Sequence, residues 1–259
     1  MREPLSRRNL IKTGGRVVLS GALAGTALQA WPHSSLAATV DWQRLFRKMP
    51  EGGFGTVKEV KGFAFANQRV LKVGDRVQAG EQLRVAKDGS LVVSAEDHTI
   101  IRLNEETVLD FHVGPREGVL ALVTGALLAV MPKGRRYLVA GPTATIGIKG
   151  TVIFRQVFTP REHTAHAMEG RTATLPAGLN DYFCTCNGET DYLRNDNRSL
   201  ITTVEAKHHK SFFLNPANPG LLQPFEMINH FDRDIRALVG MQEGPKQDLR
   251  FLDIKESGV

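Results

Sequence analysis

From residue 55 onward, short runs of Val, Ile, Leu and Phe alternate with Gly, Asn and Asp. The runs begin roughly 8–13 residues apart, a spacing typical of strands in a β-meander, a sandwich or a roll. We therefore expect an all-β body, built as a multi-stranded antiparallel sandwich or as a β-roll or β-helix-like domain. The pattern predicts strands over residues 56–66, 69–73, 82–85, 90–94, 99–103, 107–113, 118–131, 136–140, 145–154, 181–185, 200–206 and 211–214.

The polar segments predict how these strands are connected. Asp88-Gly89 predicts a tight hairpin of the primed-turn kind, because both positions tolerate a positive φ. Gly188 is expected to close the strand that begins at Asp181. The segment from Pro216 to Pro224 is rich in Pro, Gly and Asn, and we expect it to be a loop.

The periodicity changes after residue 224. Apolar residues then recur at steps of three and four, which is the period of one face of an α-helix. Charged residues fall mostly on the other positions of the helical wheel, so an amphipathic C-terminal helix is predicted, capped by Gly240 and packed on the β body. The apolar positions are Phe225, Ile228, Phe231, Ile235, Leu238 and Val239.

The first residues of the chain predict an export signal. The pair Arg7-Arg8 precedes an apolar run from Val17 to Ala30, and a small-residue site, Ser35-Leu36-Ala37, follows. With Leu10 after it, the arginine pair resembles the twin-arginine motif, whose export machinery carries folded proteins. The apolar run is shorter than the roughly 20 residues of a membrane-spanning helix. We expect a cleaved signal, a periplasmic protein and no stable membrane span after cleavage; an uncleaved anchor is the alternative.

These patterns divide the chain into five segments. Residues 1–37 form the twin-arginine signal peptide, and residues 38–54 form a lead-in. Residues 55–158 form the main β domain, residues 159–224 a β extension, and residues 225–259 the C-terminal helix and tail.

Charge and cysteine content narrow the classes of function. The net charge is +6, but residues 1–37 hold five basic residues and one acid, so only +2 remains on the rest of the chain. A nucleic-acid partner would require a clustered basic face, and we expect none. Two cysteines are too few for a disulfide-stapled scaffold. Apolar burial must therefore hold the fold together.

Four segments, in order along the chain, resemble the FecR domain family. Residues 71–83 resemble its strand-entry motif with a Gly-Asp turn, and residues 90–103 fall where that family repeats its strands. Residues 122–130 resemble an internal strand, and residues 146–154 resemble the closing motif with Lys-Gly-Thr. The resemblance covers about residues 55–158. It implies an exported β module used for protein contacts and envelope sensing, with a link to iron-related signalling and an envelope protein as partner.

The candidate chemistry lies beyond that region, in a Cys-x-Cys pair. Strand alternation places Cys184 and Cys186 on one face, where two thiols can share a partner. His208 and His209 follow at the end of a later strand, and at most one of them faces the cysteines unless the backbone kinks. His230, on the predicted helix, can close the site from outside. Two sulfurs with one or two imidazoles suit zinc, copper or iron.

Two other interpretations of the cysteines stay open. In an oxidising envelope, Cys184 and Cys186 can form a disulfide, provided that the strand bends to bring them together. They can also be idle buried thiols, with solvated histidines.

The usual catalytic motifs are missing from the sequence. We find no nucleophile elbow, no phosphate-binding loop, no dinucleotide-binding turn and no His-Glu-x-x-His. We therefore predict a non-enzymatic, FecR-like periplasmic binding or sensing module. The alternative is a metal- or cofactor-carrying periplasmic protein, with a redox role open, that uses Cys184, Cys186 and a histidine.

Overall fold

The computed structural model describes residues 52–114, 117–159, 166–168, 171–196, 198–218, 220–244 and 246–253. The predicted signal peptide and nearly all of the lead-in lie outside these residues. Within the described ranges, no helix is both long enough and apolar enough to cross a membrane.

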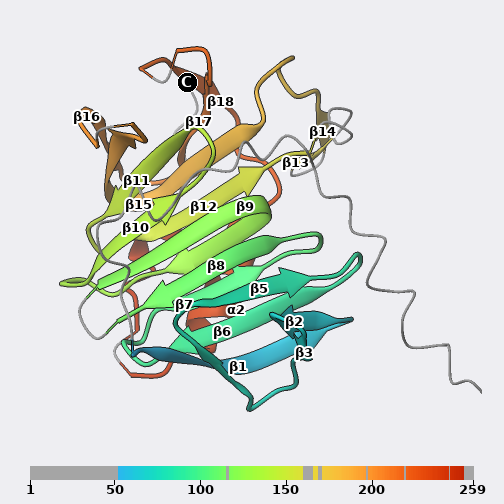
Figure 1. Cartoon of the computed structure of the whole chain (residues 1–259). Coiled ribbons are helices and arrows are strands. Elements are labelled where there is room, and N and C mark those ends of the chain that lie inside the picture. Colours follow the sequence, from blue (N-terminus) through green and yellow to red (C-terminus); the bar gives the residue numbers. More distant parts are fainter. Residues whose placement is uncertain are drawn as a thin grey trace, which may run out of the picture. The chain divides into compact units, whose positions relative to one another are not determined.

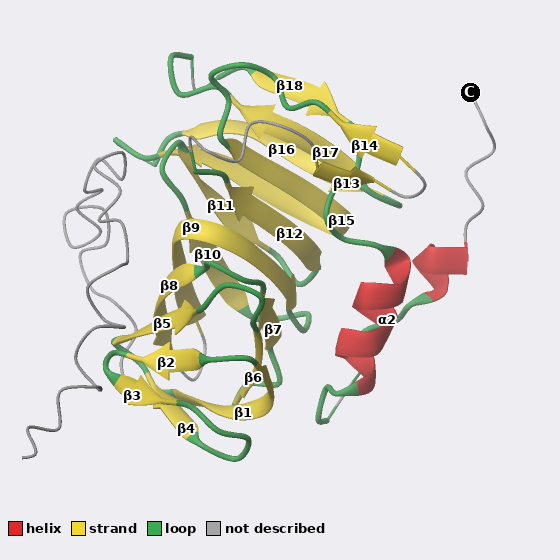
Figure 2. Cartoon of the chain, turned by 90° about the vertical axis from the view of Figure 1, so that its right-hand side faces the viewer, coloured by secondary structure: helices red, strands yellow, loops and turns green. Residues whose placement is uncertain are grey.

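The described body is built from 16 strands that form two connected sheets, A and B, and from a separate two-stranded sheet, which confirms the all-β prediction (Figures 1 and 2). The strands are β1 (Phe54–Lys61), β2 (Ala64–Ala66), β3 (Arg69–Val70), β4 (Arg76–Gln78), β5 (Glu81–Val85), β6 (Ser90–Ala95), β7 (Ile100–Leu103), β8 (Val108–Val113), β9 (Glu117–Val130), β10 (Arg136–Ala140), β11 (Ala144–Ile148), β12 (Val152–Val157), β13 (His166–Met168), β14 (Arg171–Ala173), β15 (Asp181–Arg194), β16 (Leu200–Ala206), β17 (Lys210–Leu214) and β18 (Leu222–Phe225).

Strand pairing defines the two sheets. Sheet A has the order β4-β1-β6-β7-β9-β12-β15-β17-β18. Sheet B has the order β3-β2-β5-β8-β9-β10-β11-β15-β16. The short strands β13 and β14 pair only with each other.

Two long strands, β9 and β15, belong to both sheets. The second half of β9 pairs with β7 and β12 in sheet A, and its first half pairs with β8 and β10 in sheet B. Each strand turns from one sheet to the other near a glycine with positive φ, Gly125 at +83° and Gly188 at +89°. β9 runs from sheet B into sheet A, and the chain then crosses back to sheet B before β10 begins. β10 therefore pairs parallel, not antiparallel, with the first half of β9.

Side-chain alternation divides the interior into two large apolar cores, beside a small cluster of Val119, Ala121 and Ala140. On β6, for example, Leu91 and Val93 face the core between the sheets, whereas Val92 faces the opposite side. This second side is called here the outer face of sheet A, the face turned away from sheet B. Tyr182, Cys184 and Cys186 all belong to the outer-face core. The candidate cysteines therefore point away from the centre of the sandwich.

Several local predictions are wrong. The predicted strands 56–66 and 145–154 are each two strands in different sheets, β1 with β2 and β11 with β12. Asp88-Gly89 is a turn with Asp88 at φ 59°, but it does not make a hairpin, because β5 and β6 pair in different sheets. β15 does not end at Gly188; it bends there and continues to Arg194. The predicted loop 216–224 runs into β18, which pairs with β17. Pro224 is tolerated in β18 because an edge strand does not need every N–H in the ladder.

The predicted C-terminal helix exists but begins later than expected. α2 (Asp232–Gly240) follows Phe231, whose backbone N–H donates to the Asp234 carboxylate at 2.9 Å. Phe225 lies on β18, and Asn229 has φ 58°, so the chain turns where the periodicity predicted helix. Gly240 is the last helical residue rather than the cap, which is Met241. A short 3-10 helix, η1 (Arg250–Asp253), follows.

Candidate metal centre

The two cysteines lie on β15, an interior strand of sheet A between β12 and β17. Cys184 is paired with Phe154 of β12 on one side and with Ser211 of β17 on the other. Cys186 has no partner in β12, because the register shifts there, and such a bulge re-aims a side chain. Both thiols are buried and free, and their sulfur atoms are 3.8 Å apart. A disulfide bond would require about 2.05 Å.

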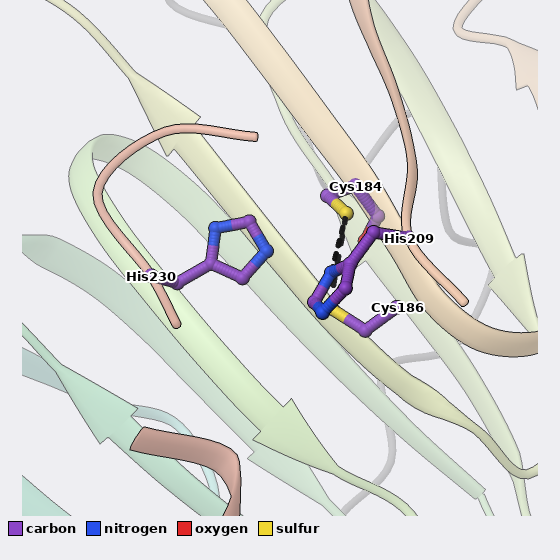
Figure 3. Close-up of side chains that lie close together, drawn as sticks. All are labelled: Cys184, Cys186, His209 and His230. Carbon is purple, nitrogen blue, oxygen red and sulfur yellow. Dashed lines mark hydrogen bonds between the residues drawn. The ribbon is translucent and has the colours of Figure 1, made fainter. Parts of the chain in front are cut away.

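His209 reaches the cysteines from the turn between β16 and β17. Its backbone adopts φ 24°, and its N–H donates to the carbonyl of Cys186 at 3.0 Å. This kink aims the imidazole at the sheet, so that Nδ1 lies 3.4 Å from the Sγ of Cys184 (Figure 3). Only 4% of the side chain is exposed.

His230 approaches the cluster from the C-terminal segment. It precedes α2 rather than lying on it, and it is fully buried, with its ring stacked on Phe154 at 4.3 Å between centroids. Nδ1 lies 2.8 Å from the carbonyl of Ile228, so that nitrogen carries the proton and donates it. Nε2 is a buried atom that makes no hydrogen bond of normal geometry. In Figure 3 this ring nitrogen faces the cysteines and His209.

One ligand atom from each of Cys184, Cys186, His209 and His230 lies within 4.8 Å of the other three. Zinc bonds of about 2.3 Å to sulfur and about 2.05 Å to nitrogen place tetrahedral ligands about 3.8 Å apart for two sulfurs and about 3.6 Å apart for sulfur and nitrogen. The observed 3.8 Å and 3.4 Å separations are close to these values. These two separations match a tetrahedral metal ion, and the remaining pairs of ligand atoms in this four-residue cage lie within 4.8 Å of each other.

His208 does not join the cysteines. Its Nε2 lies 3.4 Å from both carboxylate oxygens of Asp232, on the side of the cluster nearer to solvent. Asp232 also contacts His209, with 2.9 Å between Oδ1 and Nε2. Protein metal sites commonly have such a carboxylate behind a ligating imidazole, where it fixes the ring and raises its basicity. The sequence did not single out Asp232, because an acid between His230 and Asp234 looked like part of a solvated helix face.

The protonation states in the cluster are coupled through Cys184. Burial alone raises the pKa of the Cys184 thiol, but the hydrogen bond with Cys186 and the imidazoles of His230 and His209 outweigh burial and hold this pKa well below its ordinary value. Burial and the neighbouring Cys184 sulfur raise the pKa of Cys186 well above the ordinary value. For His209, burial lowers the pKa, yet Cys184 and Asp232 prevail and the net shift is upward. One thiolate, the form that binds metals, is thus favoured in the cluster.

The same geometry disfavours nucleophilic catalysis. A thiolate beside an imidazole is the arrangement of cysteine-dependent enzymes. The side chain of Cys184 has no exposed surface, however, and sheet A, His209 and His230 enclose it. A substrate cannot reach the sulfur in this conformation. Binding an ion is the chemistry that the enclosure permits.

Near the cluster, sheet A contains a buried ion pair that the sequence did not reveal. Arg155 of β12 donates from Nε and Nη2 to the carboxylate of Asp181 on β15, at 3.0 and 2.7 Å, and neither side chain is exposed. The guanidinium also donates to the carbonyls of Val139 and Ala144 in sheet B. Arg155 thereby ties the two sheets together beside the Cys-x-Cys strand. In the sequence, the sign of this ion pair was a single charged residue, Arg155, within the apolar run 152–157.

Comparison with known proteins adds a family match to this geometry. A family model described as FecR protein matches residues 81–171, which extend from β5 to the start of β14. The match overlaps the region whose motifs resembled that family. The four clustered side chains lie C-terminal to the matched residues, so the cage is a feature of this chain outside the family match. A comparison with curated proteins finds no similar sequence.

Two crystal structures of a candidate anti-sigma factor from Parabacteroides distasonis, at 2.50 and 1.65 Å resolution, are similar to part of the chain. Each has 13% sequence identity and a TM-score of 0.39, with 56% of this chain and 58% of that chain covered. The chain therefore spans a little more than half the length of these structures.

Proposed function

We propose that this protein is a non-enzymatic, exported signalling module that binds one transition-metal ion, with zinc as the best-fitting ion, at Cys184, Cys186, His209 and His230. A single observation carries the proposal: four ligand atoms of the right chemistry lie within 4.8 Å of one another in a buried cage. The Nε2 of His230 gives independent support, because a buried nitrogen without a hydrogen bond of normal geometry is costly unless something binds it.

The donor set favours zinc over other biological cations. Two thiolates and two imidazoles make a closed four-coordinate shell, the pattern of structural zinc sites. Magnesium and calcium prefer oxygen ligands and larger coordination numbers. Copper(I) and iron(II) also accept sulfur and nitrogen, and elemental analysis separates them from zinc.

The signalling part of the proposal is supported by the FecR match over residues 81–171. A module of this kind acts through contact with another protein, and the resemblance favours an envelope partner on the periplasmic side. Twin-arginine export suits a protein that is folded around its ion before it leaves the cytoplasm. The alternative is a FecR-like sensing module in which the four side chains bind no ion.

The decisive measurement is the metal content of protein purified from the native envelope. We expect about one zinc per chain, the stoichiometry of a four-ligand structural site. Cys184→Ser and Cys186→Ser should each bind zinc far more weakly than a variant that lacks one histidine, because each removes a charged thiolate rather than a neutral imidazole. His112→Ala is the matched control, since His112 lies on β8 in sheet B, outside the four-residue cage. Metal-free wild-type protein with a closed Cys184–Cys186 disulfide would contradict the proposal.

A further inference from the structure

We infer that the bound ion acts as a clasp, which holds the C-terminal segment, residues 226–253, against the outer face of sheet A. The inference rests on the metal site proposed above and concerns how occupancy of that site regulates the fold. Figure 2 shows the C-terminal helix beside the sheet that carries β12 and β15.

The clasp follows from where the four ligands come from. Cys184 and Cys186 lie on β15, and His209 lies between β16 and β17, so three ligands belong to the β body. His230 is the fourth, and it belongs to the C-terminal segment. Two residues later, Asp232 contacts His209 as well. An ion bound by all four would therefore link the C-terminal segment to the sheet.

The segment covers an apolar surface. Ile228, Ile235, Leu238 and Val239 are buried against the outer-face core of sheet A. That core includes Val92, Ile100, Leu128 and Phe154 from four neighbouring strands. Release of the segment would expose these side chains on both surfaces, as a new apolar patch on the sheet.

Apart from the cluster and this apolar contact, polar contacts also tie the segment to the β body. At its start, the hydroxyl of buried Tyr182 donates to the Glu226 carbonyl and accepts from the Ile228 N–H, and Asn229 donates to Gln156. Further ties follow beyond His230. Arg102 pairs with Asp234, Lys58 pairs with Glu243, and Gln242 donates to the carbonyl of His98. Surface ion pairs contribute little to stability. α2 has nine residues, which is too short for a helix to be stable without its packing. From Phe231 onward, the segment thus depends on its apolar contact and on how firmly it is held at His230.

Without an ion, the closed arrangement is penalised at His230. Its buried Nε2 makes no hydrogen bond of normal geometry and has the Cys184 sulfur as a neighbour, and opening of the segment would let water supply a better partner. A metal ion removes this penalty by binding the same nitrogen. Because the coupling is reciprocal, a docked segment also raises the affinity for the ion.

Amide hydrogen exchange of the full chain, zinc-loaded and then stripped with a chelator, tests the clasp directly. We expect the helical amides of Ile235, Leu238 and Val239 to exchange at least about tenfold faster without zinc, as local opening predicts. The amides of β5, which pairs with β2 and β8 in sheet B, serve as the internal control and should change little. Wild-type protein that binds zinc but shows equal exchange in α2 with and without the ion would overturn the clasp while leaving the metal site standing.

Variants separate the clasp from the site. His230→Ala should still bind zinc through the three remaining ligands, but zinc should no longer slow exchange in α2. His230→Gln provides the same test with less lost volume beside Phe154, and His112→Ala should behave as wild type. If zinc slows exchange in α2 of His230→Ala as strongly as in wild type, the clasp is wrong. If wild-type protein binds no zinc at all, both the metal site and the clasp are wrong.

Discussion

At the residue scale, the carboxylate of Asp232 determines how His209 presents its ring to the cysteines. The carboxylate holds Nε2 at 2.9 Å, which leaves Nδ1 facing the Sγ of Cys184. With the proton on Nε2, the lone pair of Nδ1 is free for an ion. A carboxylate outside the cage thus selects the tautomer inside it.

Asp232→Asn is therefore expected to weaken zinc binding by about 10- to 100-fold, the usual cost of losing a carboxylate behind a ligating imidazole. The four ligands remain, so the variant should still bind one ion. Competition with a chromophoric chelator measures the affinity. Asp248→Asn, which removes an exposed charge paired with Arg250, is the control. Equal affinities for wild type and Asp232→Asn would show that the carboxylate does not orient the ring.

The candidate ligands could be named from the sequence, but the sequence could not show which of the histidines join the cysteines. The Cys-x-Cys spacing and the nearby histidines identified the candidates, because sulfur and imidazole are rare enough to be conspicuous. Choosing His209 over His208 required the backbone kink at φ 24°, which has no sequence signature. The partnership of Arg155 with Asp181, 26 positions apart, likewise depends on which strands pair.

At the element scale, the sandwich depends on strands that change sheets. β9 turns at Gly125 and β15 turns at Gly188, and β15 carries the cysteines immediately before its turn. A Cβ on Gly125 would lie 2.4 Å from the Cα of Thr107, and one on Gly188 would lie 2.9 Å from the Oγ1 of Thr151. Both positions therefore combine a positive φ with a close approach that only glycine permits.

Gly125→Ala is expected to destabilise the protein by roughly 2–5 kcal/mol, because a left-handed conformation costs a side chain about 1–2 kcal/mol and overpacking costs about 1–3 more. Gly134→Ala is the matched control: Gly134 has a similar φ of +82°, but nothing lies within 4 Å of its Cβ position. Only the conformational cost, about 1–2 kcal/mol, should appear there. Urea unfolding measures both, and equal losses would mean that the turn in β9 can absorb a methyl group.

The elements themselves were largely predictable from the apolar pattern. A strand buried on one face has alternating apolar residues, and a strand buried on both faces has a continuous apolar run. Most predicted runs coincide with strands, from β5 to β10 and again at β16 and β17, whereas the run 145–154 divides into β11 and β12. The failures have one cause, which is that periodicity cannot show where the chain turns. Asn229 adopts a left-handed conformation inside a helical pattern, and Gly188 bends a strand that looked finished.

At the scale of the whole molecule, the cage is a product of tertiary structure. Its ligands come from β15, from the turn after β16 and from the segment before α2, and these meet only when sheet A is assembled. An unfolded chain therefore has no preformed site, and ion binding stabilises the native state alone. A protein of this kind would benefit from an export route that accepts folded proteins, because the ion can then bind in the cytoplasm, where the cell controls its concentration.

Replacement of both Arg7 and Arg8 by lysine is accordingly expected to leave the full-length precursor in the cytoplasm, because the twin-arginine machinery reads the arginine pair itself. Cell fractionation with immunoblotting measures the distribution, and Arg16→Lys, which changes another arginine of the same segment, should be exported normally. Zinc analysis of the retained precursor adds a second readout, since a folded precursor should already contain the ion. If the double variant reaches the periplasm as efficiently as wild type, the chain crosses by another route, and the ion must then bind after export.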